Sequence, residues 1–300
     1  MNLKDSFLYL RIRVLDASGK EIANNAAISI TNFPIVSLIE KAETYFNDKL
    51  VSTLHNYGYL EYLAVLLGKG KEEKKASLLN GLWVTDSLGT ATVKNVGYGE
   101  RLKFLEKSKS LELTGKIYDG IWQQDRYILP NVTVKLKLLR QKADFALYAP
   151  KNDVKYTIEY QEAILFVKRH MLNPIVQHQH MAALEKGEVA LYPFQDIQVN
   201  TLAIPKNELV HVRQWIFSKE DIPKRIVIGL VKSEAYEGRL DADPFNFRHF
   251  NLSKLAVTLN DDLSQYALSE FDFDSDRWLV AFEKNFQDLR RPDDIASILR

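Results

Sequence analysis

Residues 132–138 read VTVKLKL, and an aliphatic side chain occupies every second position of this stretch. Neighbouring side chains of a β-strand point to opposite faces, so such alternation predicts a half-buried strand rather than a helix. We expect the aliphatic face to point toward the core and the polar face to point toward solvent. The inward side chains of this strand would be Val132, Val134, Leu136 and Leu138.

Strand patterns recur on both sides of this stretch. Alternating or almost continuously apolar runs, many of them rich in β-branched and aromatic residues, predict further strands. These runs cover residues 7–14, 110–117, 156–167, 197–204, 225–231 and 254–259. The run at 225–231, RIVIGLV, is apolar almost throughout, as expected of a strand that is buried on both faces.

Turns and short helices separate these strands. Asn47-Asp48, between short arms at 43–46 and 49–52, predicts a tight hairpin, and Asn260-Asp261 predicts a second Asn-Asp turn. Helical spacing of apolar residues indicates helices at 59–67, 72–79 and 175–186. The last of these has Pro174 just before it and Gly187 just after it, which are conventional start and stop signals.

The chain has a polar, proline-containing stretch at its midpoint, residues 149–153. Such a stretch is typical of a linker. Each half carries long strands, a helical excursion and an Asn-Asp turn, so we predict an all-β fold with short helical excursions in two units, 1–150 and 151–300. Irregular strand spacing and long connections favour jelly rolls over a simple meander.

The composition excludes several classes of protein. The 300 residues include no cysteine, which rules out disulfides, thiol nucleophiles and cysteine-ligated metals. Lys and Arg total 40 against 39 acidic residues, and this balance argues against a dedicated nucleic-acid-binding protein. The sequence offers neither a membrane-length apolar run nor a signal peptide, so we expect an intracellular protein.

His178-Gln179-His180 with Glu185 imitates part of the cupin metal motif. Cupin ligands need a strand, where residues two apart share a face. The surrounding residues predict a helix instead, and there the two histidines diverge by about 200°. We therefore interpret them as surface histidines of a helix and predict no metal site.

An acidic run near the end of the chain has most of the spacing of an EF-hand loop. Asp272, Asp274 and Asp276 alternate with other residues, and Glu283 falls at the twelfth position. The sixth position is Arg277 where the sharp turn requires glycine. We favour a solvated face or a protected strand edge over calcium binding.

Other motifs also favour a structural interpretation. Residues 68–71, GKGK, lack the spacing of a phosphate loop, and no G-x-S-x-G nucleophile elbow occurs. A basic cluster diluted by Glu72 and Glu73 is interpreted as solvated. The cluster comprises Lys69, Lys71, Lys74 and Lys75.

Residues 239–250 are rich in aromatics and arginine; we favour a loop anchored by its three phenylalanines over base stacking. These are Phe245, Phe247 and Phe250.

Several stretches, read in order, resemble the double jelly-roll major capsid proteins of Polinton-type (Maverick) eukaryotic DNA elements, which are similar to adenovirus hexon. The resemblance extends from about residue 5 to about residue 260. It is strongest at 223–231, PKRIVIGLV. The other matching stretches are 56–63, 74–79, 113–117, 124–132, 137–140, 163–169, 173–174, 183–187, 192–193, 235–238 and 246–251.

The resemblance implies a structural, non-enzymatic capsid subunit without cofactor or metal. Three such chains would form a pseudo-hexagonal trimeric capsomer of an icosahedral shell. The implied partners are the homotrimer, neighbouring capsomers and a penton or minor capsid protein, with weak or no nucleic-acid contact. The implied location is the virion, and the nucleus or cytoplasm during assembly, without secretion.

The chain departs from the family pattern at its ends. Family members continue beyond the strand ending near Leu259, whereas residues 269–300 match nothing in the family, and the N-terminus is short. We therefore expect a chain truncated at both ends, with an incomplete second jelly roll. The alternative is a truncated or host-co-opted jelly roll that binds a ligand or carbohydrate without assembling, and a cupin-type enzyme is a third hypothesis.

Overall fold

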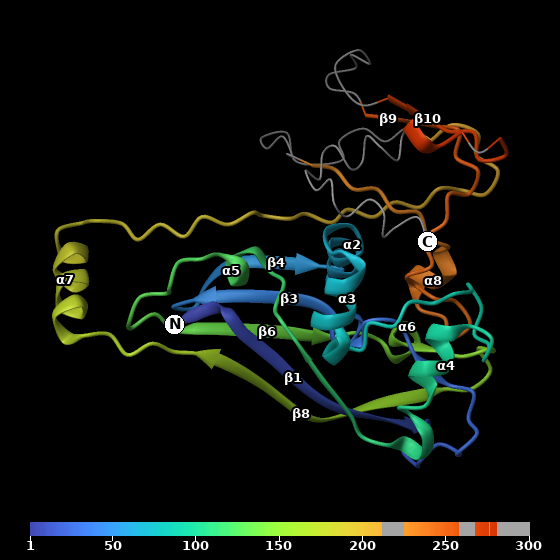
Figure 1. Ribbon diagram of the computed structural model, residues 1–300, viewed down its shortest axis with the longest axis horizontal. Coiled ribbons are helices and arrows are strands. Elements are labelled where there is room, and N and C mark those ends of the chain that lie inside the picture. The colour runs from blue at the N-terminus through green and yellow to red at the C-terminus, as the bar shows by residue number, and fades with distance from the viewer. Residues whose placement is uncertain (212–224, 258–267, 276, 281–300) are drawn as a thin grey trace.

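The computed structural model describes residues 1–211, 225–257, 268–275 and 277–280 (Figure 1). Its strands form several antiparallel sheets with short helices between them, which confirms the predicted β-rich character. Two sheets have three strands each, in the orders β5-β1-β8 and β4-β3-β6, and two smaller sheets pair β2 with β7 and β9 with β10.

The first sheet is built around β1 (Asn2–Asp16), with β5 (Leu111–Gly115) and β8 (Tyr156–Lys168) on either side. It confirms the strands predicted at 7–14, 110–117 and 156–167. From Ser6 to Val14, every second side chain of β1 is buried, as the pleat requires. The buried side chains along its second half are Leu8, Leu10, Ile12 and Val14.

The second sheet contains β3 (Ile39–Phe46), β4 (Lys49–His55) and β6 (Val134–Arg140). The predicted hairpin joins β3 to β4, and both of its turn residues have positive φ, 47° at Asn47 and 63° at Asp48. Such backbone matches the twist of a two-residue hairpin. In β6 the predicted inward face packs against the core.

The remaining elements are short. The small sheets consist of β2 (Ser29–Ile30), β7 (Leu147–Tyr148), β9 (Lys254–Ala256) and β10 (Leu268–Glu270). The helices are α1 (Pro34–Ser37), α2 (Tyr57–Gly68), α3 (Lys71–Ser77), α4 (Val96–Leu102), α5 (Gly120–Gln123), α6 (Ala143–Ala146), α7 (Pro174–Glu185) and α8 (Ser233–Glu237). Helices α2, α3 and α7 confirm the three predicted ones. Within the described ranges no helix is long and apolar enough to cross a membrane.

One hydrophobic core joins the two three-stranded sheets. It includes Leu113 of the first sheet, Leu54 of the second and Trp122 of α5, all nearly inaccessible to solvent. Burying each large apolar side chain contributes roughly 1.5–3 kcal/mol. We call residues 1–168, which contain both sheets, the body.

The body crosses the boundary that the sequence predicts between residues 150 and 151. Strand β8 lies after that boundary, yet it pairs with β1 from Asp16↔Tyr156 to Asn2↔Lys168. The central sheet therefore contains residues from both sides of the predicted linker. The division into two jelly rolls stays a prediction.

Two strands predicted in the second half are wrong. Residues 197–204 and 225–231 are described but form no strand, and most of their side chains are exposed. A strand needs a neighbour to satisfy its backbone N–H and C=O groups, and no described residue forms a ladder with either run. The prediction at 254–259 is confirmed at β9, whereas residues 258–259 and the predicted Asn260-Asp261 turn lie outside the described residues.

Candidate assembly surface

The most conspicuous surface feature is a long projection that we call the arm, residues 169–211. In Figure 1 it leaves the end of β8, turns through α7 at one extremity of the molecule and returns alongside the body. Pro174 begins α7 and the Asn173 side chain caps it by accepting the Ile175 N–H at 2.9 Å. No residue of the arm is buried. Only Tyr192, Phe194 and Val199 of the arm pack, partly buried, against the core of the chain.

The arm exposes many large apolar side chains. The most exposed are Met171, Ile175, Val189, Leu191, Leu209 and Val210. Single exposed apolar residues are ordinary, but a concentration of them along one segment makes that segment a candidate interaction surface.

Specific contacts hold part of the returning arm against the body. The Tyr192 hydroxyl accepts the Leu129 N–H at 3.1 Å, and the Tyr192 ring packs edge-on against Phe46. The Arg126 guanidinium donates to the Leu191 carbonyl at 2.7 Å. Leu191 is thus fixed through its backbone while its side chain stays exposed.

A second apolar surface lies on the outer face of the first sheet, where the arm begins. Phe7 of β1 stacks on Phe166 of β8 with ring centroids 4.8 Å apart, and Ile164 is exposed on the same strand. We call these three side chains the Phe patch. Toward the other end of β8 the outer face becomes charged, with Arg11 of β1 paired to Glu162 at 3.5 Å.

The candidate metal-binding histidines lie on α7, as predicted. His178 and His180 are exposed, and so is Glu185. Side chains two residues apart on a helix point in different directions, so they do not converge on one point. No group of three metal-binding side chains occurs among the described residues.

The basic cluster near α3 is partly engaged with the body. Lys69 forms an ion pair with Glu73. The Lys74 ammonium donates to the Leu66 carbonyl at 2.8 Å and lies 5.9 Å from the centre of the Trp83 ring. These cations are held by their own chain rather than gathered into one basic surface. The side chain of Lys75 lies outside the described part.

Asp272 of the EF-hand-like run caps a local turn. Its carboxylate accepts the Ser275 N–H at 3.1 Å, and hydrogen bonding to the Ser275 side chain, together with this backbone bond, lowers the pKa of Asp272. Its backbone pairs with that of Arg277. Asp276 and Glu283 lie outside the described residues, so the calcium interpretation is not tested.

Two carboxyl groups are enclosed in the core beside the second sheet. Glu61 of α2 is fully buried, and its Oε1 has no hydrogen-bond partner within the described ranges. Asp119 accepts hydrogen bonds from the Thr44 and Ser52 hydroxyls, each at 2.9 Å. Burial raises the pKa of both carboxyls, because a low-dielectric interior penalises their charged forms. Neither group is presented at the surface.

Among the described residues that follow the body, buried side chains occur only within residues 233–247. We call this stretch the docking segment. Its buried residues are Ala235, Leu240, Asp243, Pro244 and Phe245. The Phe245 ring stacks on Tyr62 of α2 with centroids 4.1 Å apart and an interplanar angle of 4°. Phe247 is half-buried against the core and Phe250 is exposed, so two of the three predicted anchors are confirmed.

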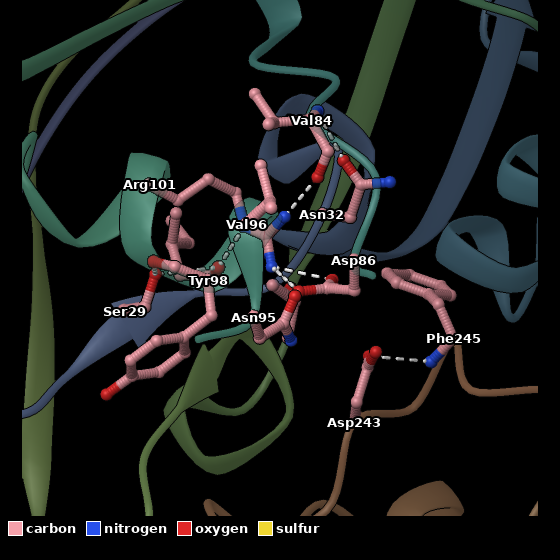
Figure 2. Close-up of polar contacts among 12 residues, drawn as sticks. Ser29, Asn32, Val84, Asp86, Asn95, Val96, Tyr98, Arg101, Asp243 and Phe245 are labelled. Carbon is pink, nitrogen blue, oxygen red and sulfur yellow. Dashed lines mark hydrogen bonds and ion pairs between the residues drawn. The ribbon is translucent and has the colours of Figure 1, made fainter. Parts of the chain in front are cut away.

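A buried polar cluster lies next to the docking segment (Figure 2). Arg101 of α4 is completely buried and donates to both oxygens of Asp86, at 2.7 and 3.0 Å. It also donates to the carbonyls of Ile30, at 2.8 Å, and Val84. Every nitrogen of the guanidinium is therefore engaged, and the charge is balanced by one carboxylate. The sequence gives no local signal of this cluster.

Comparison with known proteins identifies a distant relative. No family model matches the chain. The chain is 23% identical, over 296 residues, to an uncharacterized protein of Caenorhabditis elegans. The alignment covers 94% of this chain and 68% of the relative, so it includes most of the body, the arm and the docking segment.

Proposed function

We propose that the chain is a structural shell subunit of the double jelly-roll capsid class that associates with copies of itself through the arm. The exposed apolar surface of the arm carries this proposal, because no described residue of the chain covers that surface. The antiparallel sheets and the ordered sequence resemblance also support it. The shell would form in the nucleus or cytoplasm and persist in the virion.

The proposal assigns complementary roles to the two apolar surfaces. The arm of one copy would cover the Phe patch of the next copy, so that the contact joins two different surfaces. Such a heterologous contact closes into a ring when the rotation between copies is correct. Three copies would give the trimer that a pseudo-hexagonal capsomer requires, and the capsomers would then contact one another and a penton or minor capsid protein.

The mass of the purified full chain in solution tests this proposal. Size-exclusion chromatography with light scattering should give three times 34.6 kDa. Replacing Val189 and Leu191, which are 78% and 67% exposed, by Ser should release monomers with an intact body. The matched control is Val93→Ser, because Val93 is 79% exposed but lies in a loop of the body.

Each other result has a defined meaning. A wild-type chain that stays monomeric at all concentrations contradicts assembly, and specific glycan binding by that monomer would support a ligand-binding jelly roll instead. A trimer that survives both arm substitutions would remove the arm from the interface. Loss of the trimer in Val93→Ser would show that the effect is not specific to the arm.

A further inference from the structure

The docking segment places a second carboxyl group beside the buried ion pair. Asp243 is 8% exposed and precedes Pro244 in a turn. Its carboxylate accepts the Phe245 N–H at 2.9 Å, and its carbonyl accepts the Asn246 N–H at 3.2 Å. Asp followed by Pro is a favoured start for such a turn. In Figure 2 the Asp243 carboxyl points toward Asp86.

The charge of Asp243 has no dedicated counter-ion in the described part of the chain. Arg101 is already bound to Asp86 and to two carbonyls. Tyr59, Tyr62 and Tyr148 also interact electrostatically with Asp243, but burial raises their pKa values and keeps them neutral. On its own segment, Asp241 pairs with Arg239. An ionised Asp243 therefore faces one carboxylate and one shared cation.

We propose that Asp243 makes the docking segment a proton-controlled latch, which is held most tightly on the body when this carboxyl is protonated and loosens when it ionises. This inference does not depend on assembly. Ionisation would place a negative charge next to Asp86 in a site that excludes water, and opening the segment lets that charge reach solvent. Burial, with a smaller contribution from Asp86, raises the pKa of Asp243 to about 6.

The direction of the pH effect follows from the raised pKa of Asp243 in the closed state. When the segment opens, Asp243 returns toward the ordinary value of 3.8 and releases its proton more readily. The closed state therefore binds more protons than the open state between about pH 4 and 6, and closing weakens as the pH rises through this window. From pH 5 to pH 8 the opening equilibrium should increase about tenfold.

Hydrogen exchange of the full chain, followed by mass spectrometry at pH 5 and pH 8, tests the latch. After correction for the intrinsic exchange rate, peptides covering residues 239–247 should be about tenfold less protected at pH 8. Peptides of β1 should show no such change, because they report on the body. Asp243→Asn retains an acceptor for the Phe245 N–H and should remove the pH effect.

Two further variants sharpen the result. Asp241→Asn changes an exposed carboxylate on the same segment and should leave the pH effect intact. Asp86→Asn frees Arg101 to pair with Asp243, so the pH effect should shrink. Equal corrected protection of wild type at both pH values would overturn the latch, and so would a pH effect that persists in Asp243→Asn. Tryptic cleavage at Arg239 and Arg248 gives an independent readout if a variant exchanges too fast to measure.

Discussion

The body and the region after it both contain strand-like sequence, but only the body buries it. The run at 132–138 provides β6, which is paired along β3 and packed on the core. The run at 225–231 is at least as apolar, yet it forms no strand ladder with any described residue, and Ile226, Val227 and Ile228 are exposed. A periodic pattern therefore marks a segment that can become a strand, and a neighbouring strand decides whether it does.

The largest difference in stability should appear between two variants that shorten a leucine, one in the core of the body and one in the arm. Leu113 of β5 is 0% exposed, and Leu113→Ala should lower the free energy of unfolding by about 2–5 kcal/mol through lost burial and the cavity left behind. The same change at Leu209, which is 98% exposed in the arm, should cost almost nothing. Urea denaturation of both variants measures the difference.

A comparable loss in both variants would contradict this division. It would mean that the arm is packed in the folded molecule and contributes to the same cooperative unit as the core. The measurement is best made at a low concentration of protein, because self-association through the arm would add stability of its own.

The local features of the body follow from its sequence. Alternation located β1, β5, β6 and β8, and Asn47-Asp48 located the hairpin because these residue types tolerate positive φ. The two phenylalanines that anchor the docking segment were also predicted from composition, as large apolar groups within a loop.

The long-range features do not follow from any local pattern. The pairing of β8 with β1 joins residues about 150 positions apart, across a stretch that has the composition of a linker. The Arg101 cluster joins three separate segments, and arginine in a short helix is usually solvated. The Asp-Pro turn at Asp243 gives a weak local signal, but nothing in it indicates that the carboxyl is buried against Asp86.

Acidification should affect the body and the docking segment in opposite directions. It should lower the stability of the body and strengthen the closure of the docking segment. In the body, Glu43 accepts from Lys41 at 2.5 Å, Tyr45 at 2.8 Å and Lys137 at 3.1 Å. These hydrogen bonds, led by that from Lys41, lower the pKa of Glu43 from 4.5 to about 2. Its contribution to stability is present above pH 4.5 and is lost as the pH falls toward 2.

Glu43→Gln should therefore be less stable than wild type at pH 7, and the two should converge near pH 2. The measurement is urea denaturation across this range, with exposed Glu40→Gln as the control that should follow wild type at every pH. If the difference in the free energy of unfolding between wild type and Glu43→Gln stays constant from pH 7 to pH 2, then packing of the Glu43 side chain, not its charge, supports the sheet.

The smallest effect should come from two positions with the same backbone conformation in the two regions. Asp48 in the hairpin has a φ of 63°, and Asn207 in the arm has a φ of 66°. Glycine adopts this conformation without a Cβ penalty, and Asn-Gly is a preferred pair for a two-residue hairpin, so Asp48→Gly should stabilise the body by roughly 0.5 kcal/mol. Asn207→Gly should leave the free energy of unfolding almost unchanged, because Asn207 lies in an exposed turn of the arm. Replicate urea titrations can resolve the difference in stability through the denaturation midpoint.

A gain in stability at Asn207 equal to that at Asp48 would place the arm inside the cooperative unit. No gain in stability at Asp48 would show that its side chain compensates for the left-handed backbone.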